Sequence, residues 1–283
     1  DWQKSAIGED KPDVNFIAQR NANVIRVARS MDKVCKSLDV GCGTGQLVLD
    51  LAREGVHSVG VDFAPEMIQL SNASKNEAGL NNAEFITQSI FDFPSPEQPF
   101  DLVSALGFIQ YVSAEELWEL CVKVNSMLRV GGDFVVSARN RLFNVFSLNV
   151  FTEMEYNFGI IQDLHREALN ITKSETQAEA VDAVRNLNQT FPQPDSHPQT
   201  RGIDVAVRYQ HTPSELVMLL ESTGFEVQGL FPVHFHGFPI VVKDEHPAIH
   251  VELANLMFAK NDDDHRLIPQ SSAFVVDAKK VSD

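Results

Sequence analysis

The most informative segment of the chain is Leu38-Asp39-Val40-Gly41-Cys42-Gly43-Thr44-Gly45-Gln46. An apolar run, residues 34–40, leads into it, and apolar residues at helical spacing follow it. This order predicts a strand, a tight glycine turn and a helix. Glycines let the backbone take positive φ and approach a ligand closely. The start of the helix offers free N–H groups to a polar or anionic group.

The glycine spacing separates two classes of cofactor site. A dinucleotide-binding loop usually reads G-x-G-x-x-G, whereas this chain reads G-x-G-x-G with Asp39 two residues before Gly41. The second predicted strand ends in Asp62, where an acid can bind both hydroxyls of a ribose. Together these features resemble the S-adenosylmethionine (SAM) site of class I methyltransferases. An NAD-dependent oxidoreductase is the alternative enzyme, and the spacing disfavours it.

The resemblance implies a cofactor site in the glycine loop and just after the second strand. The predicted residues there are Asp39, Gly41, Cys42, Gly43, Gly45, Asp62, Phe63 and Met67. By the resemblance, the glycines pass under the methionine part of SAM and Asp62 binds the ribose. Phe63 and Met67 could flank the adenine ring, although Met67 fits core packing equally well.

Two later loops extend the implied site. Many family members have Gly-Asp-Ala where this chain has Gln88-Ser89-Ile90, and their acid binds the adenine amino group. Ser89 could accept that hydrogen bond more weakly, and Ile90 could contact adenine through its backbone N–H. In doubly wound sheets, ligands bind outside the carboxyl ends of the strands. Leu106 and Gly107, at the end of the fourth predicted strand, would therefore lie beside the reacting methyl group.

The whole pattern predicts an α/β fold with a Rossmann-like, doubly wound, mostly parallel seven-stranded sheet and an inserted, mainly helical cap. The seven strands are predicted at 34–40, 57–61, 83–87, 100–106, 134–138, 225–233 and 273–278. A capping box at Ser113 begins the helix before the fifth strand, and Gly131 and Gly132 are expected to end it. The seventh strand is expected to be antiparallel and to form the sheet edge next to the sixth.

Four segments follow from this pattern. They are an N-terminal helical lid, a SAM-binding core, an inserted cap that holds the substrate, and the C-terminal part of the core, at 1–33, 34–139, 140–210 and 211–283. A helix packed on the sheet is the alternative to the lid. The insert is too long for an ordinary connection, and its aromatic residues suggest an apolar or ring-binding pocket. A helical subdomain that only packs or dimerises is the competing interpretation.

Methyl transfer from SAM is an in-line displacement, so the enzyme must mainly align the reacting groups. A hydroxyl acceptor also needs a base, and histidine suits neutral pH. Among His165, His211, His234 and His236, we favour His211 and His236. The predicted catalytic residues are His211, His236 and Tyr111, and the predicted substrate-binding residues are Arg139, Asn140 and Tyr156.

A metal site is not predicted. His234 and His236 are two residues apart, so on a strand they would share one face. No acid lies nearby at ligand spacing, and two histidines alone are weak grounds for a metal.

Composition limits the class of partner. The chain has 283 residues and a formal net charge of −16. This charge disfavours a nucleic-acid substrate. Three cysteines without metal spacing suit a reducing cytosol, and we expect a cytoplasmic protein because no membrane-spanning run or signal peptide is apparent.

We therefore expect a biosynthetic methyltransferase that uses SAM, leaves S-adenosylhomocysteine, and acts on oxygen or nitrogen of a small-molecule metabolite. A homodimer is the oligomer that the insert suggests. The non-enzymatic alternative is a methyltransferase-like scaffold that serves a partner protein.

Overall fold

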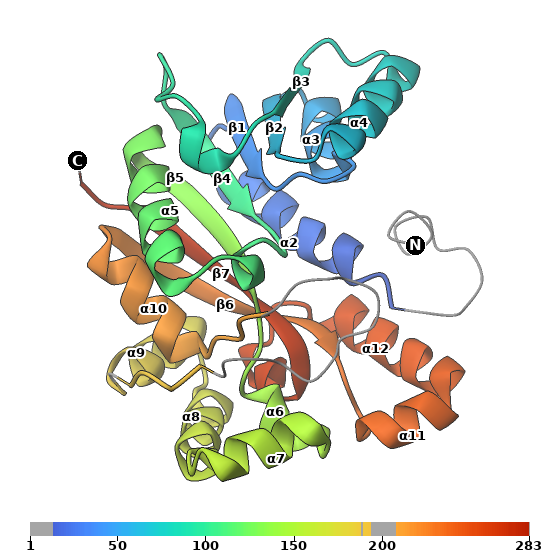
Figure 1. Ribbon diagram of the computed structural model, residues 1–283, viewed down its shortest axis with the longest axis vertical. Helices are drawn as coiled ribbons and strands as arrows, with labels where there is room; N and C mark the ends of the chain where they lie inside the picture. The colour runs from blue at the N-terminus through green and yellow to red at the C-terminus, as the bar shows by residue number, and fades with distance from the viewer. Residues whose placement is uncertain (1–13, 188, 194–207, 283) are drawn as a thin grey trace. The chain divides into compact units, whose positions relative to one another are not determined.

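The computed structural model describes residues 14–187, 189–193 and 208–282. One sheet of seven strands has the order β3-β2-β1-β4-β5-β7-β6 (Figure 1). The chain forms two compact units. One unit comprises 1–20, 138–218 and 229–275, and the other comprises 21–137, 219–228 and 276–283. We call them the insert unit and the loop unit.

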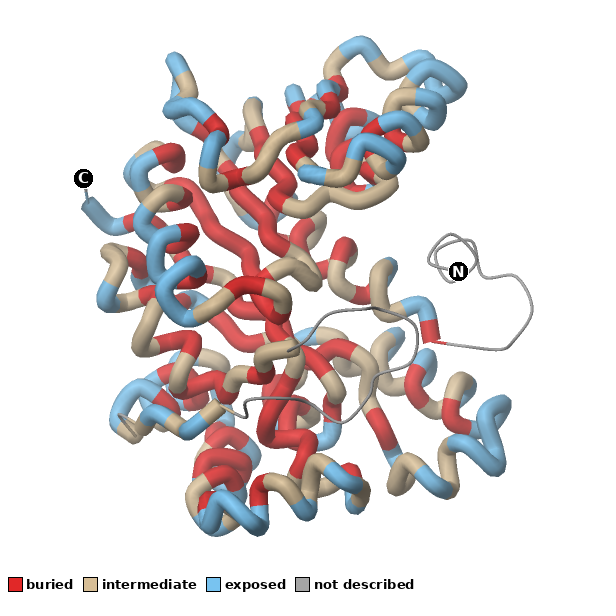
Figure 2. Tube along the Cα trace, in the orientation of Figure 1, coloured by how far each residue is buried: buried red, intermediate tan, exposed pale blue. Residues whose placement is uncertain are grey.

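The loop unit carries the parallel strands that the sequence predicts. Its elements are α2 (Phe16–Ser30, from Asn21 on), β1 (Lys36–Val40), α3 (Gln46–Arg53), β2 (His57–Asp62), α4 (Pro65–Ala78), β3 (Ala83–Thr87), η1 (Ile90–Asp92), β4 (Phe100–Ala105), η2 (Ile109–Tyr111), α5 (Ala114–Met127) and most of β5 (Leu128–Arg139). β1 pairs in parallel with β2 and β4, β2 pairs with β3, and β4 pairs with β5. The strands are largely buried (Figure 2), and their buried positions include the polar residues Ser37, Asp39 and Ser58 as well as apolar ones.

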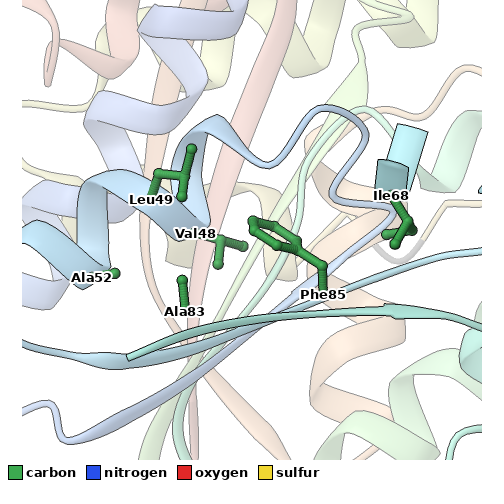
Figure 3. Packing of buried hydrophobic residues seen from close by; sticks show 6 residues of the cluster. All are labelled: Val48, Leu49, Ala52, Ile68, Ala83 and Phe85. Carbon is green, nitrogen blue, oxygen red and sulfur yellow. The ribbon is translucent and has the colours of Figure 1, made fainter. Parts of the chain in front are cut away.

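An apolar cluster fixes α3 and α4 to β3. It contains Val48, Leu49, Ala52, Ile68, Ala83 and Phe85, which come from α3, α4 and β3 (Figure 3). Leu47, Val48 and Leu51 recur at helical spacing and are buried, so α3 forms because one face of it is covered. This packing holds the start of α3 directly behind the glycine turn.

The helix before β5 begins as predicted and ends earlier than predicted. Ser113 Oγ accepts the N–H of Glu116 and the Glu116 side chain accepts the N–H of Ser113, which is the predicted capping box. The helix ends at Met127, and Leu128 is already extended. The predicted glycine stop is therefore wrong. Gly131 and Gly132 lie inside β5, near a register shift in its pairing with β4.

The insert unit contains a run of helices that ends in the last strands. Its elements are α6 (Phe143–Ser147), α7 (Val150–Asn157), α8 (Ile161–Lys173), α9 (Gln177–Arg185), the start of α10 (Pro213–Ser222), most of β6 (Phe225–Phe235), α11 (Ile240–Glu245), α12 (Pro247–Asn261), η3 (His265–Gln270) and the start of β7 (Ser271–Lys280). Thr212 Oγ1 accepts the N–H of Glu215 and so caps α10, as its sequence predicts.

A buried ion pair organises the first helices of this unit. Arg141 donates to both carboxylate oxygens of Glu155, from Nε at 2.9 Å and from Nη2 at 2.8 Å. The guanidinium also lies over the rings of Phe158 and Phe191, and Asn144 donates to Glu155 at 2.7 Å. Both charged side chains are essentially inaccessible to solvent. The pair therefore fixes the chain just after β5 to α7.

The last two strands correct one topological expectation. At one end of β7, the Asn140 N–H donates to Ser272 O, and at the other end Lys280 Nζ donates to Leu128 O. β7 thus runs antiparallel to β5, as predicted. It lies between β5 and β6, however, so β6 forms the edge and the prediction that β7 forms it is wrong. Neither strand is uniformly apolar, so the sequence alone did not show which of the two lies inside the sheet and which forms its edge.

The predicted segment boundaries stay predictions. Part of the predicted lid, residues 1–13, and part of the predicted cap, residues 194–207, lie outside the described residues. In the described parts, the insert belongs to the same compact unit as 229–275. Among the described helices, none is long and apolar enough to cross a membrane.

Candidate active site

The glycine turn after β1 has the backbone that its sequence predicts. Gly41, Gly43 and Gly45 all have positive φ, at 67°, 53° and 77°. A Cβ added at Gly45 would lie 2.4 Å from Cε1 of Phe85, whereas one added at Gly43 would meet nothing within 4 Å. Gly45 is therefore required by packing inside the protein. Gly43 presents an open backbone face to which a ligand could come close.

Hydrogen bonds to β2 and α4 hold the glycine turn in place. The N–H groups of Gly41 and Cys42 both donate to Val61 O, at 2.8 and 3.1 Å, and Ser71 Oγ donates to Gly43 O at 2.9 Å. The Cys42 side chain packs on the apolar cluster and blocks a Cβ at Gly60. Cys42 thus points its thiol into the core, which leaves only its backbone to face a cofactor.

Asp62 at the end of β2 joins the two loops of the predicted site. Its Oδ2 accepts the N–H of Gly43 and its Oδ1 accepts the N–H of Ala64, both at 2.9 Å. An ionised carboxylate has about four acceptor positions, so both oxygens can still accept hydroxyl groups. Beside it, Phe63 is 75% exposed and Met67 is half-buried. An exposed phenyl ring beside this carboxylate offers a flat apolar surface.

Asp39 lies buried in β1 under this loop. Ser104 Oγ donates to its Oδ1 at 2.6 Å. Burial, with a smaller contribution from the charge of Asp62, raises the pKa of Asp39 to about 7 against the opposing effect of the Ser104 hydrogen bond. A cationic ligand group nearby would favour the charged carboxylate. Asp39 is thus able to respond electrostatically to a positively charged cofactor.

The other predicted cofactor residues lie in the same unit. Ser89 Oγ accepts the N–H of Phe91 at 3.3 Å as the cap of η1, and Ile90 is buried. Gly107 follows β4 with φ 68°, and its N–H donates to Ser137 Oγ at 2.8 Å. Leu106, between β4 and Gly107, is half-buried.

Sequence reasoning missed four supporting residues of this site. Phe108 lies against the glycine turn, because a Cβ at Gly41 would be 2.8 Å from its Cδ2. Ser71, Ser104 and Ser137 hold Gly43, Asp39 and Gly107 by the hydrogen bonds described above. The only sequence signal for Phe108 is its place after Gly107 at a strand end. The serines carry no signal, because only the fold brings them to their partners.

The predicted catalytic residues are divided between the units. Tyr111 is half-buried in η2 of the loop unit. His211 is in the insert unit, where its backbone bonds to Arg139 and Arg141. Burial, with a smaller effect of the Arg141 charge, lowers the pKa of His211 to about 4. A neutral His211 can accept a proton near pH 7, but such a low pKa makes it a weak base.

The predicted substrate residues have unequal access. Tyr156 on α7 is 75% exposed, and Arg139 at the end of β5 is half-buried. Asn140 is buried, and its Nδ2 donates to both Ile268 O and Ser271 O at 2.6 and 2.8 Å. Its Oδ1 accepts the Leu142 N–H. This geometry gives the Asn140 side chain a structural role at the start of the insert.

Three histidines gather at the end of β6. His234 and His236 have ring centroids 4.2 Å apart, so they share a side as their spacing predicts. His250 from α12 joins them, with its Nε2 3.0 Å from Nε2 of His234. Burial, aided by the charges of Lys243 and His250, lowers the pKa of His236 to about 3. Sequence reasoning missed His250, because its helix gives no sign that it packs on this strand end.

Part of the chain is similar in sequence to known methyltransferases. Residues 38–132 match the family described as methyltransferase domain. A ubiquinone biosynthesis O-methyltransferase of Xylella fastidiosa (strain 9a5c) is 33% identical over 115 residues, which are 40% of this chain and 45% of that protein. The chain thus spans about half the length of the curated relatives it matches.

Solved structures agree in fold. A SAM-dependent methyltransferase from Methanosarcina mazei superposes with a TM-score of 0.57 at 18% identity, covering 91% of this chain and 98% of that one. Magnesium protoporphyrin IX methyltransferase from Synechocystis PCC 6803, solved with bound S-adenosylhomocysteine, gives 0.54 at 14% identity, covering 99% and 92%. At such identities the likeness establishes the fold alone. The sequence match identifies residues 38–132 as a methyltransferase domain, and the seven-stranded fold and the glycine turn agree with the class I SAM-dependent type.

Proposed function

We propose that this protein transfers a methyl group from SAM to an oxygen or nitrogen of a small-molecule metabolite. The proposal rests mainly on Gly43 and Asp62, because the backbone of Gly43 is open on one side and its N–H donates to the Asp62 carboxylate. The carboxylate of Asp62 orders the turn through the Gly43 N–H and keeps acceptor positions for two ribose hydroxyls. The residues beside it, Phe63, Met67, Ser89 and Ile90, would contact the adenine.

The charge of the cofactor fits the buried acid. SAM carries a positive sulfur and a positive amino group next to its carboxylate. Asp39 has its pKa raised to about 7 by burial, so a nearby cation would shift it toward the charged form. S-adenosylhomocysteine has lost the sulfur charge. Asp39 would thus favour the methyl donor over the product.

A small-molecule acceptor is supported by charge and by relatives. A net charge of −16 opposes binding to nucleic-acid phosphates. The Xylella fastidiosa relative is named for O-methylation in ubiquinone biosynthesis, so hydroxyl acceptors are the first to screen. A hydroxyl acceptor requires a base, and His211, His236 and Tyr111 remain the proposed catalytic residues. Arg139 and Tyr156 remain proposed substrate contacts.

We also propose a cytoplasmic location, on the basis of the cysteines. The free cysteines Cys35, Cys42 and Cys121 fit a reducing cytoplasm. A homodimer through the insert stays a prediction, and sedimentation equilibrium of the purified chain tests it.

Calorimetric titration with SAM and with S-adenosylhomocysteine tests the proposed cofactor site. We expect micromolar binding by the wild type and at least tenfold weaker binding by Asp62→Ala, since hydrogen bonds to a charged group contribute about 1.5–3 kcal/mol. Asp92→Ala removes an exposed carboxylate after β3 and is the matched control. Far-UV circular dichroism shows whether each variant is folded. Absence of heat with both ligands in the wild type would refute the proposal, and binding without turnover across acceptor screens would indicate a scaffold.

A further inference from the structure

We propose that His234, His236 and His250 bind one divalent transition-metal ion. One nitrogen from each ring lies within 4.8 Å of the other two. The inference concerns the insert unit alone and does not depend on methyl transfer, and it replaces the catalytic role proposed above for His236 with that of a metal ligand. The ion would join the end of β6 to α12, two elements that Figure 1 shows meeting in this unit.

The spacing of the rings suits three ligands on one ion. Zinc–nitrogen bonds of about 2.0–2.1 Å at tetrahedral angles place ligand nitrogens about 3.3 Å apart. The Nε2 atoms of His234 and His250 are already 3.0 Å apart. The centroid of the His236 ring lies 4.2 Å from that of His234 and 4.8 Å from that of His250. Small rotations of the side chains would bring the third nitrogen into the same coordination sphere.

His236 has buried polar atoms that the protein leaves unused. The residue is 5% exposed, and within the described part of the chain neither Nδ1 nor Nε2 has a hydrogen-bond partner. Buried ring nitrogens are almost always hydrogen-bonded, and each exception needs an explanation. A metal ion would supply the missing partner. The face of the ring is covered by Phe143, with centroids 4.5 Å apart, so the imidazole is held near its position.

The backbone at His234 is also unusual. Its φ is 59°, one of two positive values outside glycine in the described residues. This left-handed conformation costs energy for a residue with a Cβ, and such positions cluster at functional sites. The His234 N–H is anchored at 2.8 Å by Oε1 of Gln19. The rings of His234 and His236 both lie against His250, with centroids 5.2 and 4.8 Å from its ring.

The charges around the cluster decide which ion and which fourth ligand fit. Lys243 and Arg20 are close enough to act electrostatically on His234. With two cations nearby and three neutral ligands, an anionic fourth ligand such as hydroxide or a carboxylate would balance the charge. Imidazole nitrogens select zinc, cobalt, nickel or copper, whereas magnesium and calcium require oxygen. The site is therefore assigned to a zinc-like ion with an anion in the fourth position.

Cobalt(II) titration of the chelator-treated full chain tests the assignment. We expect one ion per chain, the intense visible absorption of tetrahedral cobalt, displacement by zinc, and no effect of magnesium. Each of His234→Asn, His236→Gln and His250→Gln should weaken binding roughly a hundredfold or more. Asparagine tolerates the left-handed backbone at 234. Lys243→Gln should tighten binding by roughly two- to fivefold, because one repulsive charge is removed.

Controls separate the cluster from surface binding and from misfolding. His165→Gln removes an exposed histidine of the same unit and should bind cobalt as the wild type does. Proton NMR of the wild-type cobalt form should show paramagnetically shifted ring protons from three histidines, which identifies the ligands without any substitution. Failure of the wild type to bind cobalt or zinc, or full binding by folded His236→Gln, would overturn the proposal.

Discussion

Three glycine-to-alanine substitutions in the loop unit distinguish packing, backbone conformation and cofactor access. Gly43, Gly45 and Gly79 all have positive φ, at 53°, 77° and 65°. Alanine in this conformation costs about 1–2 kcal/mol, and the loss of freedom in the unfolded chain returns about 0.4–1 kcal/mol. Gly43→Ala and Gly79→Ala meet no atom within 4 Å. We therefore expect each to lower the free energy of unfolding by about 1 kcal/mol.

Gly45→Ala carries a steric cost in addition. Its Cβ would lie 2.4 and 2.5 Å from two ring carbons of Phe85 and 3.0 Å from Cβ of Ser71. Phe85 belongs to the buried cluster of Figure 3 and cannot rotate away freely. Overpacking of this kind costs about 1–3 kcal/mol. The total for Gly45→Ala is then about 3 kcal/mol, and urea denaturation followed by circular dichroism measures it.

Binding of SAM separates the two mild variants. The Cβ of Gly43→Ala would project into the open face where we place the methionine part, so calorimetry should show at least tenfold weaker binding, or about 1.4 kcal/mol. Gly79→Ala lies at the end of α4 and should bind SAM as the wild type does. The reasoning fails if Gly45→Ala is no less stable than Gly79→Ala, or if Gly43→Ala binds SAM normally.

Three further predictions concern stability. Burial raises the pKa of Asp39 to about 7. The folded chain therefore keeps a proton that the unfolded chain loses at about pH 3.9, so the free energy of unfolding falls as pH rises between these two values. We expect Asp39→Asn to show a smaller drop in melting temperature than the wild type between about pH 4 and pH 7. Glu155→Gln leaves the buried charge of Arg141 without its counter-ion and should cost about 3–5 kcal/mol, whereas Arg141→Met combined with Glu155→Leu should recover most of that loss in urea denaturation. Leu148 is exposed with φ 49°, so Leu148→Gly should raise the midpoint of urea unfolding by the equivalent of about 1 kcal/mol, and an unchanged midpoint would contradict the backbone assignment.

Local signals predicted most of the loop unit correctly. Buried strands and helix caps are encoded by neighbouring residues, as the strand that leads into the glycine turn and the capping box at Ser113 show. The helix end near Gly131 was wrong, because pairing with β4 extends β5 back to Leu128. Strand pairing is a non-local interaction, and here it outweighed the local preference of glycine for a helix end.

Local sequence was enough to predict the glycine turn, the acid at Asp62 and the class of the fold. These features depend on φ values and spacings within a few residues. Long-range packing places β7 inside the sheet, brings Ser104 and Ser137 to the candidate site, and brings His250 to His234 and His236. Each of these contacts joins residues that are distant in the chain. The type of residue at one position does not predict which distant segment of the chain will pack beside it.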